Sequence, residues 1–155
     1  MKGFTLVELL IVIAITFILA VSAVPIYGSL QVQAQLNEST SQIVQTLRSA
    51  RQMSVSGYNN SQHGVYFDVT AGNDKYILYQ GSDYSARDNS YDRETILDGS
   101  LPLSFIDLSL TGDDVDINFT KNKGKASNTG TVTLTHDVSG QRQIIINSLG
   151  VVEEN

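Results

Sequence analysis

The sequence predicts an α+β fold in which one long N-terminal helix packs on antiparallel β-sheet. The first observation is a stretch of helical character from Phe4 to about residue 56, which Gly57 and two asparagines then end. The second is a change of period after His63, where apolar residues alternate in short runs separated by Gly, Asn and Asp. Consecutive short strands without intervening helices form antiparallel sheet. With 155 residues, the chain suits one globular domain plus one special segment.

The segment at the N-terminus, residues 1–27, is almost entirely apolar. Lys2 and Glu8 are its only charged side chains, and only Thr16 and Ser22 interrupt the run of residues 9–24. Counted from Phe4, the segment reaches the roughly 20 residues that a helix needs to cross the core of a bilayer. We therefore expect residues 4–27 to be a transmembrane helix, preceded by a short leader of residues 1–3.

Three interpretations compete for this segment: a secretory signal peptide, a plain membrane anchor, or a helix that assembles with other helices. Lys2 and the small residues around Ala23 suit a signal peptide, which would release a soluble secreted domain. Glu8 argues against the first two interpretations, because a carboxylate at the mouth of an apolar run is costly in lipid and usually marks function. The sequence favours an assembly helix, with the secreted domain as the alternative from another class.

The second half of the helix, residues 28–57, is amphipathic. Its apolar positions recur at spacings of seven, four and three residues, and they are Leu36, Ile43, Leu47 and Ala50. A helix of residues 4–56 would be roughly 80 Å long. A membrane span joined to a half that packs on a domain explains this length. Pro25 removes one backbone hydrogen bond, so we expect a kink or local melting near residues 21–28.

The remaining residues, 58–155, form a predicted β-rich headpiece. Its short β-type runs are separated by clusters of Gly, Asn and Asp. The predicted strands are residues 65–69, 76–79, 94–97, 103–108, 115–119, 131–135, 143–146 and 151–152. There is no internal repeat and no alternation of strands with helices, so a parallel sheet is not expected.

A specific motif opens the helix: Gly3-Phe4-Thr5-Leu6-Val7-Glu8-Leu9-Leu10. It closely resembles the signal of type IV pilins and type II secretion pseudopilins. The resemblance implies that a prepilin peptidase cuts between Gly3 and Phe4 and that the new amine of Phe4 is methylated. It implies other pilin or pseudopilin subunits and an inner-membrane assembly platform as partners. It also implies a chain held in the inner (cytoplasmic) membrane, with its headpiece in the periplasm or outside the cell, until it enters a filament.

Glu8 stands four residues after Phe4, about one helical turn from the new N-terminus. In a filament of staggered helices, its carboxylate can meet the Phe4 ammonium of a neighbouring subunit, and each charge relieves the cost of the other in apolar surroundings. Within one chain, Glu8 can instead neutralise its own Phe4 amine or reach the membrane interface. We expect the pair between subunits, and we expect it to select register more than to add stability.

A second similarity lies in the headpiece. The runs that carry it are Leu47-Arg48-Ser49-Ala50-Arg51, Ile117-Asn118-Phe119, Lys123-Gly124, Thr131-Val132-Thr133-Leu134, Ile144-Ile145-Ile146 and Gly150-Val151. They resemble the GspH/FimT family, which comprises minor pseudopilins of type II secretion and minor pilins of type IV pili. The resemblance implies a subunit that initiates or caps a fibre. A major type IV pilin for adhesion or motility is the alternative within this class.

The charge of the chain disfavours nucleic acid as a partner. The formal net charge is -6, which repels phosphate backbones over most of the surface. Family members proposed to bind DNA carry arginines after the C-terminal glycine, whereas Gly150 is followed here by Val151-Val152-Glu153-Glu154.

Little in the sequence indicates catalysis or a cofactor. There is no cysteine, which excludes disulfides and thiolate chemistry. His63 and His136 are isolated from any spaced set of metal ligands, and no serine stands in a nucleophile elbow. We therefore expect that the protein is not an enzyme. Two acidic stretches, residues 83–92 and 107–116, offer weak calcium candidates, although solvated loops are favoured. The best set is Asp113, Asp114 and Asp116, with Asn118 beside them.

Overall fold

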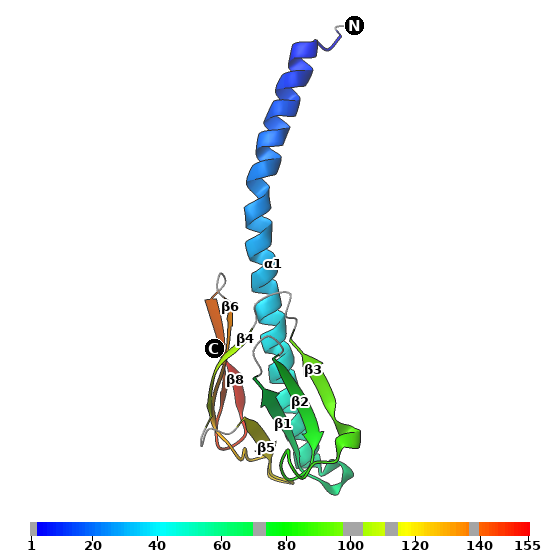
Figure 1. Cartoon of the computed structure of the whole chain (residues 1–155), viewed down its shortest axis with the longest axis vertical. Coiled ribbons are helices and arrows are strands. Elements are labelled where there is room, and N and C mark those ends of the chain that lie inside the picture. Colours follow the sequence, from blue (N-terminus) through cyan, green and yellow to red (C-terminus); the bar gives the residue numbers. More distant parts are fainter. Residues whose placement is uncertain (1–2, 70–73, 98–103, 111–114, 137–139) are drawn as a thin grey trace.

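The computed structural model describes residues 3–69, 74–97, 104–110, 115–136 and 140–155. One helix, α1 (Leu6–Ser56), dominates it: the N-terminal half projects from the headpiece, and the C-terminal half is packed within it (Figure 1). The helix begins after Thr5, which has an extended backbone and caps the first turn, so it starts two residues later than expected. It ends at Gly57, whose left-handed backbone (φ 65°) lets its N–H donate to the carbonyls of Met53 and Ser54.

The backbone of α1 passes through Pro25 without a break. The local melting expected near residues 21–28 is therefore not present, while the kink itself stays a prediction. Among the described residues, no helix combines the length and the apolar character that crossing a membrane requires.

The headpiece contains two four-stranded antiparallel sheets. Their strands are β1 (His63–Asp68), β2 (Lys75–Gln80), β3 (Arg93–Ile96), β4 (Ser104–Leu110), β5 (Asp116–Phe119), β6 (Gly130–His136), β7 (Gly140–Ile146) and β8 (Val152–Glu154). The first sheet has the order β3-β2-β1-β5 and the second has the order β4-β6-β7-β8. Strands β4 and β5 are neighbours in the chain but lie in different sheets. Two short 3-10 turns, η1 (Tyr58–Asn60) and η2 (Asn89–Tyr91), complete the fold.

The core lies where both sheets pack against α1. The helix supplies the four apolar residues predicted from its spacing, Leu36, Ile43, Leu47 and Ala50, and all four are completely buried. The sheets supply Val65, Phe67, Ile117 and Phe119 from the first and Val132, Leu134 and Ile144 from the second. Helix α1 contacts β1, β2 and β5 of one sheet and β6, β7 and β8 of the other. The helix is therefore the element that joins the two sheets into one domain.

Candidate functional site

The start of α1 places the predicted cleavage bond outside the helix. Residues 3–5 are non-helical and exposed, and 82% of the Phe4 surface is accessible. Thr5 and Glu8 form a capping box. The Thr5 N–H donates to Glu8 Oε2 at 3.0 Å, the Thr5 hydroxyl donates to the same oxygen at 2.9 Å, and the Glu8 N–H donates to Thr5 Oγ1 at 3.2 Å. Because the box fixes the first helical turn, the bond between Gly3 and Phe4 stays in accessible, non-helical chain.

Within one chain, Glu8 therefore has Thr5 as its partner. Both contacts of its carboxylate are hydrogen bonds to neutral groups. The box leaves the negative charge of Glu8 unneutralised by any cation that the structure describes. The expected pairing of Glu8 with the Phe4 amine of another subunit stays a prediction.

The first turns of α1 expose apolar side chains in every direction. From Leu6 to Val21, each large apolar side chain is more than half accessible, and the least accessible of them, Val12, is 51% exposed. The hydroxyl of Thr16 donates to the carbonyls of Val12 and Ile13, each at 2.9 Å, so it adds no unsatisfied group. An apolar surface this extensive on a single chain marks a place that another apolar surface covers.

A cluster of two arginines and two glycines ties the C-terminal segment to α1. Arg51 Nε donates to the carbonyl of Gly124 at 3.1 Å and its Nη2 to the carbonyl of Leu149 at 3.4 Å. One turn earlier, Arg48 Nη2 donates to the carbonyl of Val152 at 3.0 Å. We call Arg48, Arg51, Gly124 and Gly150 the arginine–glycine cluster. Hydrogen bonds to backbone carbonyls join α1, the loop between β5 and β6, and the C-terminal segment at this cluster.

Both glycines of this cluster are required by their geometry. Gly124 (φ 62°) and Gly150 (φ 75°) have left-handed backbones, which favour glycine. A Cβ atom on Gly150 would lie 2.0 Å from the Gly124 carbonyl oxygen, and one on Gly124 would lie 2.5 Å from a methyl group of Val55. Three of the runs that carry the headpiece resemblance, residues 47–51, 123–124 and 150–151, thus meet at one place.

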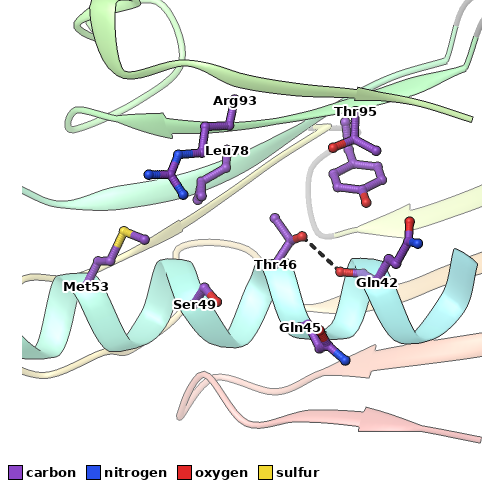
Figure 2. A pocket seen from close by; sticks show the side chains of 9 residues that line it. Gln42, Gln45, Thr46, Ser49, Met53, Leu78, Arg93 and Thr95 are labelled. Carbon is purple, nitrogen blue, oxygen red and sulfur yellow. Dashed lines mark hydrogen bonds between the residues drawn. The ribbon is translucent and has the colours of Figure 1, made fainter. Parts of the chain in front are cut away.

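A second feature is a hollow between α1 and the edge of the first sheet, with a volume of about 360 Å³. Figure 2 shows Gln42, Thr46 and Met53 of α1 facing Leu78, Arg93 and Thr95 of the sheet. The Thr46 hydroxyl donates to the carbonyl of Gln42 at 2.9 Å. The residues that line the hollow include no carboxylate and no histidine. It therefore offers hydrogen bonds and apolar contact, and no acid–base pair.

The chemistry-bearing groups of the first sheet serve packing. The Tyr79 hydroxyl is buried and donates to the Asp116 carboxylate, with distances of 2.7 and 2.9 Å to its two oxygens, while the Asn118 amide donates to the same hydroxyl at 2.9 Å. Burial and the adjacent Asp116 charge raise the pKa of Tyr79 well above its ordinary value. A Cβ on Gly64 would lie 2.5 Å from this hydroxyl, so a glycine inside β1 makes room for it. Sequence reasoning missed this network, for which a glycine within a strand was the one available signal.

The calcium candidates receive no support from the described residues. Asp116 is engaged with Tyr79 and also accepts the backbone N–H of Tyr84 at 3.1 Å. Asp113 and Asp114 lie outside the described residues. Within the part of the chain that the structure describes, no three His, Cys, Asp or Glu side chains gather as a metal site.

The other acidic stretch, residues 83–92, lies in the surface loop of residues 81–92, which we call the acidic loop. Asp83 accepts the hydroxyls of Ser82 and Ser85, and Asp88 accepts the hydroxyl and N–H of Ser90. These hydrogen bonds, led by those from Ser85 and Ser90, hold the pKa of each carboxyl below its ordinary value. Both side chains are therefore ionised at neutral pH.

Arg87 fastens the acidic loop to the sheet. It pairs with Asp92 at 2.8 Å and lies 3.7 Å from the ring centre of Tyr84, which in turn stacks on Tyr66 with 3.7 Å between the ring centres. The bond to Asp92 raises the pKa of Arg87. These contacts give the loop a fixed place beside β1 and β2.

Both histidines are buried, as structural histidines would be. His63 is 3% exposed and His136 is 5% exposed. The backbone of His63 is held by Ser54, which accepts its N–H at 2.8 Å. Burial lowers the pKa of the His63 imidazole, while a hydrogen bond with the Gln80 side chain opposes that shift.

Comparisons with known proteins agree with both resemblances. The family model described as type II transport protein GspH matches residues 39–150, which is more than half of the chain. The model described as the prokaryotic N-terminal methylation motif matches residues 1–24. No curated protein matches the chain. No solved structure matches it either.

Proposed function

This chain belongs to the family of the type II transport protein GspH, and from that premise we propose that it is a minor subunit of a pilus-like filament. The family and the methylation motif make it a type II secretion pseudopilin or a type IV pilin-like subunit. Within that class we propose a minor pseudopilin of a type II secretion system or a minor pilin, which would initiate or cap the fibre. Its role is structural and not enzymatic.

The observation that carries this proposal is the junction at Thr5. A helix whose large apolar side chains are each more than half exposed as far as Val21 begins there, directly after an accessible Gly3–Phe4 bond. A cut at that bond leaves the apolar helix attached to the headpiece. The product then has an exposed apolar N-terminal half of α1, which needs an apolar environment, and a folded headpiece with its own core. This is the form that a subunit needs if it waits in a membrane and later packs into a fibre.

We propose the following sequence of states. The precursor is anchored in the inner membrane through residues 4–27, with Lys2 on the cytoplasmic side in line with the positive-inside tendency. A prepilin peptidase cuts behind Gly3, and the amine of Phe4 is methylated. An inner-membrane assembly platform then moves the subunit into the fibre, where residues 6–21 exchange lipid for the helices of other subunits. Because both settings are apolar, this exchange is nearly balanced and packing or the Glu8 charge decides it.

Quantitative mass spectrometry of the N-terminal peptide tests the proposal, on sheared filaments and on membranes of the native cell. A methylated Phe4 terminus in both fractions, with trace amounts in the fibre, is the expected result. High abundance in the sheared fraction would make the chain a major pilin for adhesion or motility. A terminus near Val24 and a soluble product would instead identify a secreted domain and overturn the proposal.

A further inference from the structure

Two arginines of the arginine–glycine cluster lack an acidic partner. In the described part of the headpiece, Arg87 pairs with Asp92, and Lys75 pairs with Asp68 and Glu94. Arg48 and Arg51 instead donate only to backbone carbonyls, and no described carboxylate lies within ion-pair distance of either. Arg93 and Arg142 also form no ion pair among the described residues, so what sets Arg48 and Arg51 apart is that their two guanidinium groups stand side by side at one hollow.

The two guanidinium groups border a hollow that has room for such a ligand. Its volume is about 290 Å³, and Gln52 and the backbone turn at Gly150 line it together with Arg48 and Arg51. Arg48 is exposed and uses one N–H for Val152, so most of the five N–H donors of a guanidinium remain available. A planar guanidinium group with free N–H donors can form two parallel hydrogen bonds to the two oxygens of one carboxylate. The hollow therefore has the chemistry of a carboxylate site.

The same chain presents the complementary charge on another face. The acidic loop carries Asp83 and Asp88, both ionised and held in place by serines, and it follows β2 in the first sheet. Arg48 is bound to the strand β8, which belongs to the second sheet. Strands β3 and β8 lie on opposite sides of α1 (Figure 1). Subunits that stack with the same orientation touch through different faces, which is the geometry that generates a fibre rather than a closed dimer.

We propose that Arg48 and Arg51 bind the carboxylates of an acidic surface loop on the neighbouring subunit of the fibre, of the kind that this chain itself carries at residues 81–92. This inference rests on the proposed function. Opposite charges on the two faces would orient the headpieces as they meet and would disfavour wrong neighbours. Arg51, which is held by two carbonyls, positions the site, and the exposed Arg48 supplies most of the free donors.

The test is a site-specific photo-crosslink in the native cell, made with the full chain. A photoreactive amino acid replaces Gln52, which is exposed and lines the hollow. Crosslinked peptides are identified by mass spectrometry, and the same cells are scored for a mature Phe4 terminus and for incorporation into fibres. The Arg48→Gln variant removes one of the two positive charges at the site. Arg93→Gln is the matched control, because Arg93 is another exposed arginine without an acidic partner among the described residues, on the opposite side of α1.

We expect a crosslink to an acidic segment of a fibre subunit, with a yield that falls about fivefold in Arg48→Gln and is unchanged in Arg93→Gln. Three kinds of result would overturn the site while leaving the proposed function intact. The first is an equal yield in both variants, and the second is no crosslink at all. The third is a crosslink to a segment without carboxylates, to nucleic acid or to lipid. A chain that is neither cut at Phe4 nor present in fibres would overturn the proposed function, and this inference with it.

Discussion

Gly150 combines a left-handed backbone with a contact that leaves no room for a side chain. In Gly150→Ala, the new Cβ would lie 2.0 Å from the Gly124 carbonyl oxygen, which also accepts a hydrogen bond from Arg51. Either the turn or that hydrogen bond has to give way. We expect a loss of about 2–4 kcal/mol of unfolding free energy, measured as a lower melting temperature of the full chain in mild detergent.

Gly140→Ala provides the control for this substitution. Gly140 also has a left-handed backbone (φ 84°), but a Cβ there would meet no atom within 4 Å. Its substitution should cost only the backbone strain, about 1–2 kcal/mol. If the two variants melt at the same temperature, the close packing of the arginine–glycine cluster does not contribute to stability.

His63 makes stability depend on pH in a defined direction. Burial lowers the pKa of its imidazole below the ordinary value of 6.5. In the unfolded chain the imidazole has its ordinary pKa of about 6.5, and in the folded chain its pKa is lower. Between these two pKa values the unfolded chain binds more protons than the folded chain. The contribution to stability is therefore complete above about pH 6.5 and is lost as the pH drops below it. We expect the melting temperature to fall from about pH 7.5 to about pH 5.5, and to fall less in His63→Gln.

Two other groups with shifted pKa values do not interfere with that measurement. Asp83 and Asp88 have pKa values below their ordinary 3.8, so they titrate under more acidic conditions. An unchanged pH dependence in His63→Gln would show that the buried imidazole is not the group responsible.

At the scale of elements, the capping box separates two roles of Glu8. In Glu8→Gln, the glutamine side chain can still accept the hydrogen bond from the Thr5 N–H, but it carries no charge. Glu8→Ala removes both the cap and the charge. We expect both variants to be cut at Phe4 and both to enter fibres poorly, about tenfold below the parent, because neither could form the proposed charge pair with the next subunit.

The outcome is read from the fraction of mature chain in sheared fibres. Glu8→Gln entering fibres at the level of the parent, with Glu8→Ala failing, would assign the role to the cap. Normal entry of both variants would contradict any part for Glu8 in assembly.

The elements themselves were largely predictable, because each depends on local pattern. The spacing of Leu36, Ile43, Leu47 and Ala50 identified the face of α1 that is now buried. The short β-type runs after His63 located the eight strands of the described residues, whose ends differ from the prediction by at most a few residues. The helix starts at Leu6 and not at Phe4 because Thr5 caps it, a pattern of Thr followed by Glu three residues later that the sequence already contains.

The pairing of strands was not predictable from the same patterns. Alternation shows which residues face a core and is silent on which strands are neighbours. Strand β5 pairs with β1 in the first sheet, whereas β4 pairs with β6 in the second. The convergence of Arg51, Gly124 and Gly150 is likewise a product of that topology. Arg51 donates to the carbonyls of Gly124 and Leu149, which lie 73 and 98 positions further along the sequence. Sequence similarity marked these residues, and only the fold shows that they touch.

At the scale of the whole molecule, the chain divides into a projecting rod and a domain with a complete core. The buried residues of α1 begin at Leu36, and the side chains described before residue 30 contribute none. We therefore expect a chain lacking residues 1–28 to fold, to stay in solution without detergent, and to melt cooperatively. Its melting temperature should lie within about 4 °C of that of the full chain, a shift that corresponds to about 1 kcal/mol.

Circular dichroism against temperature checks this expectation, with the full chain in detergent as the reference. Loss of the cooperative transition in the shortened chain would contradict the division, because the rod would then be needed to hold the headpiece together. A chain that requires detergent despite the deletion would point to a further apolar surface on the headpiece.

The way α1 runs through the headpiece also decides how the domain bears mechanical load. A pull on the projecting end of the helix acts along its axis, and the helix contacts strands of both sheets over its C-terminal half (Figure 1). The buried contacts of that half, together with the bonds of Arg48 and Arg51 to three separate carbonyls, would then be strained in shear and at the same time. Breaking many contacts at once requires more force than peeling them apart in turn. We therefore expect the headpiece to keep its fold when the projecting end of α1 is pulled, as the proposed transfer from membrane to fibre would require.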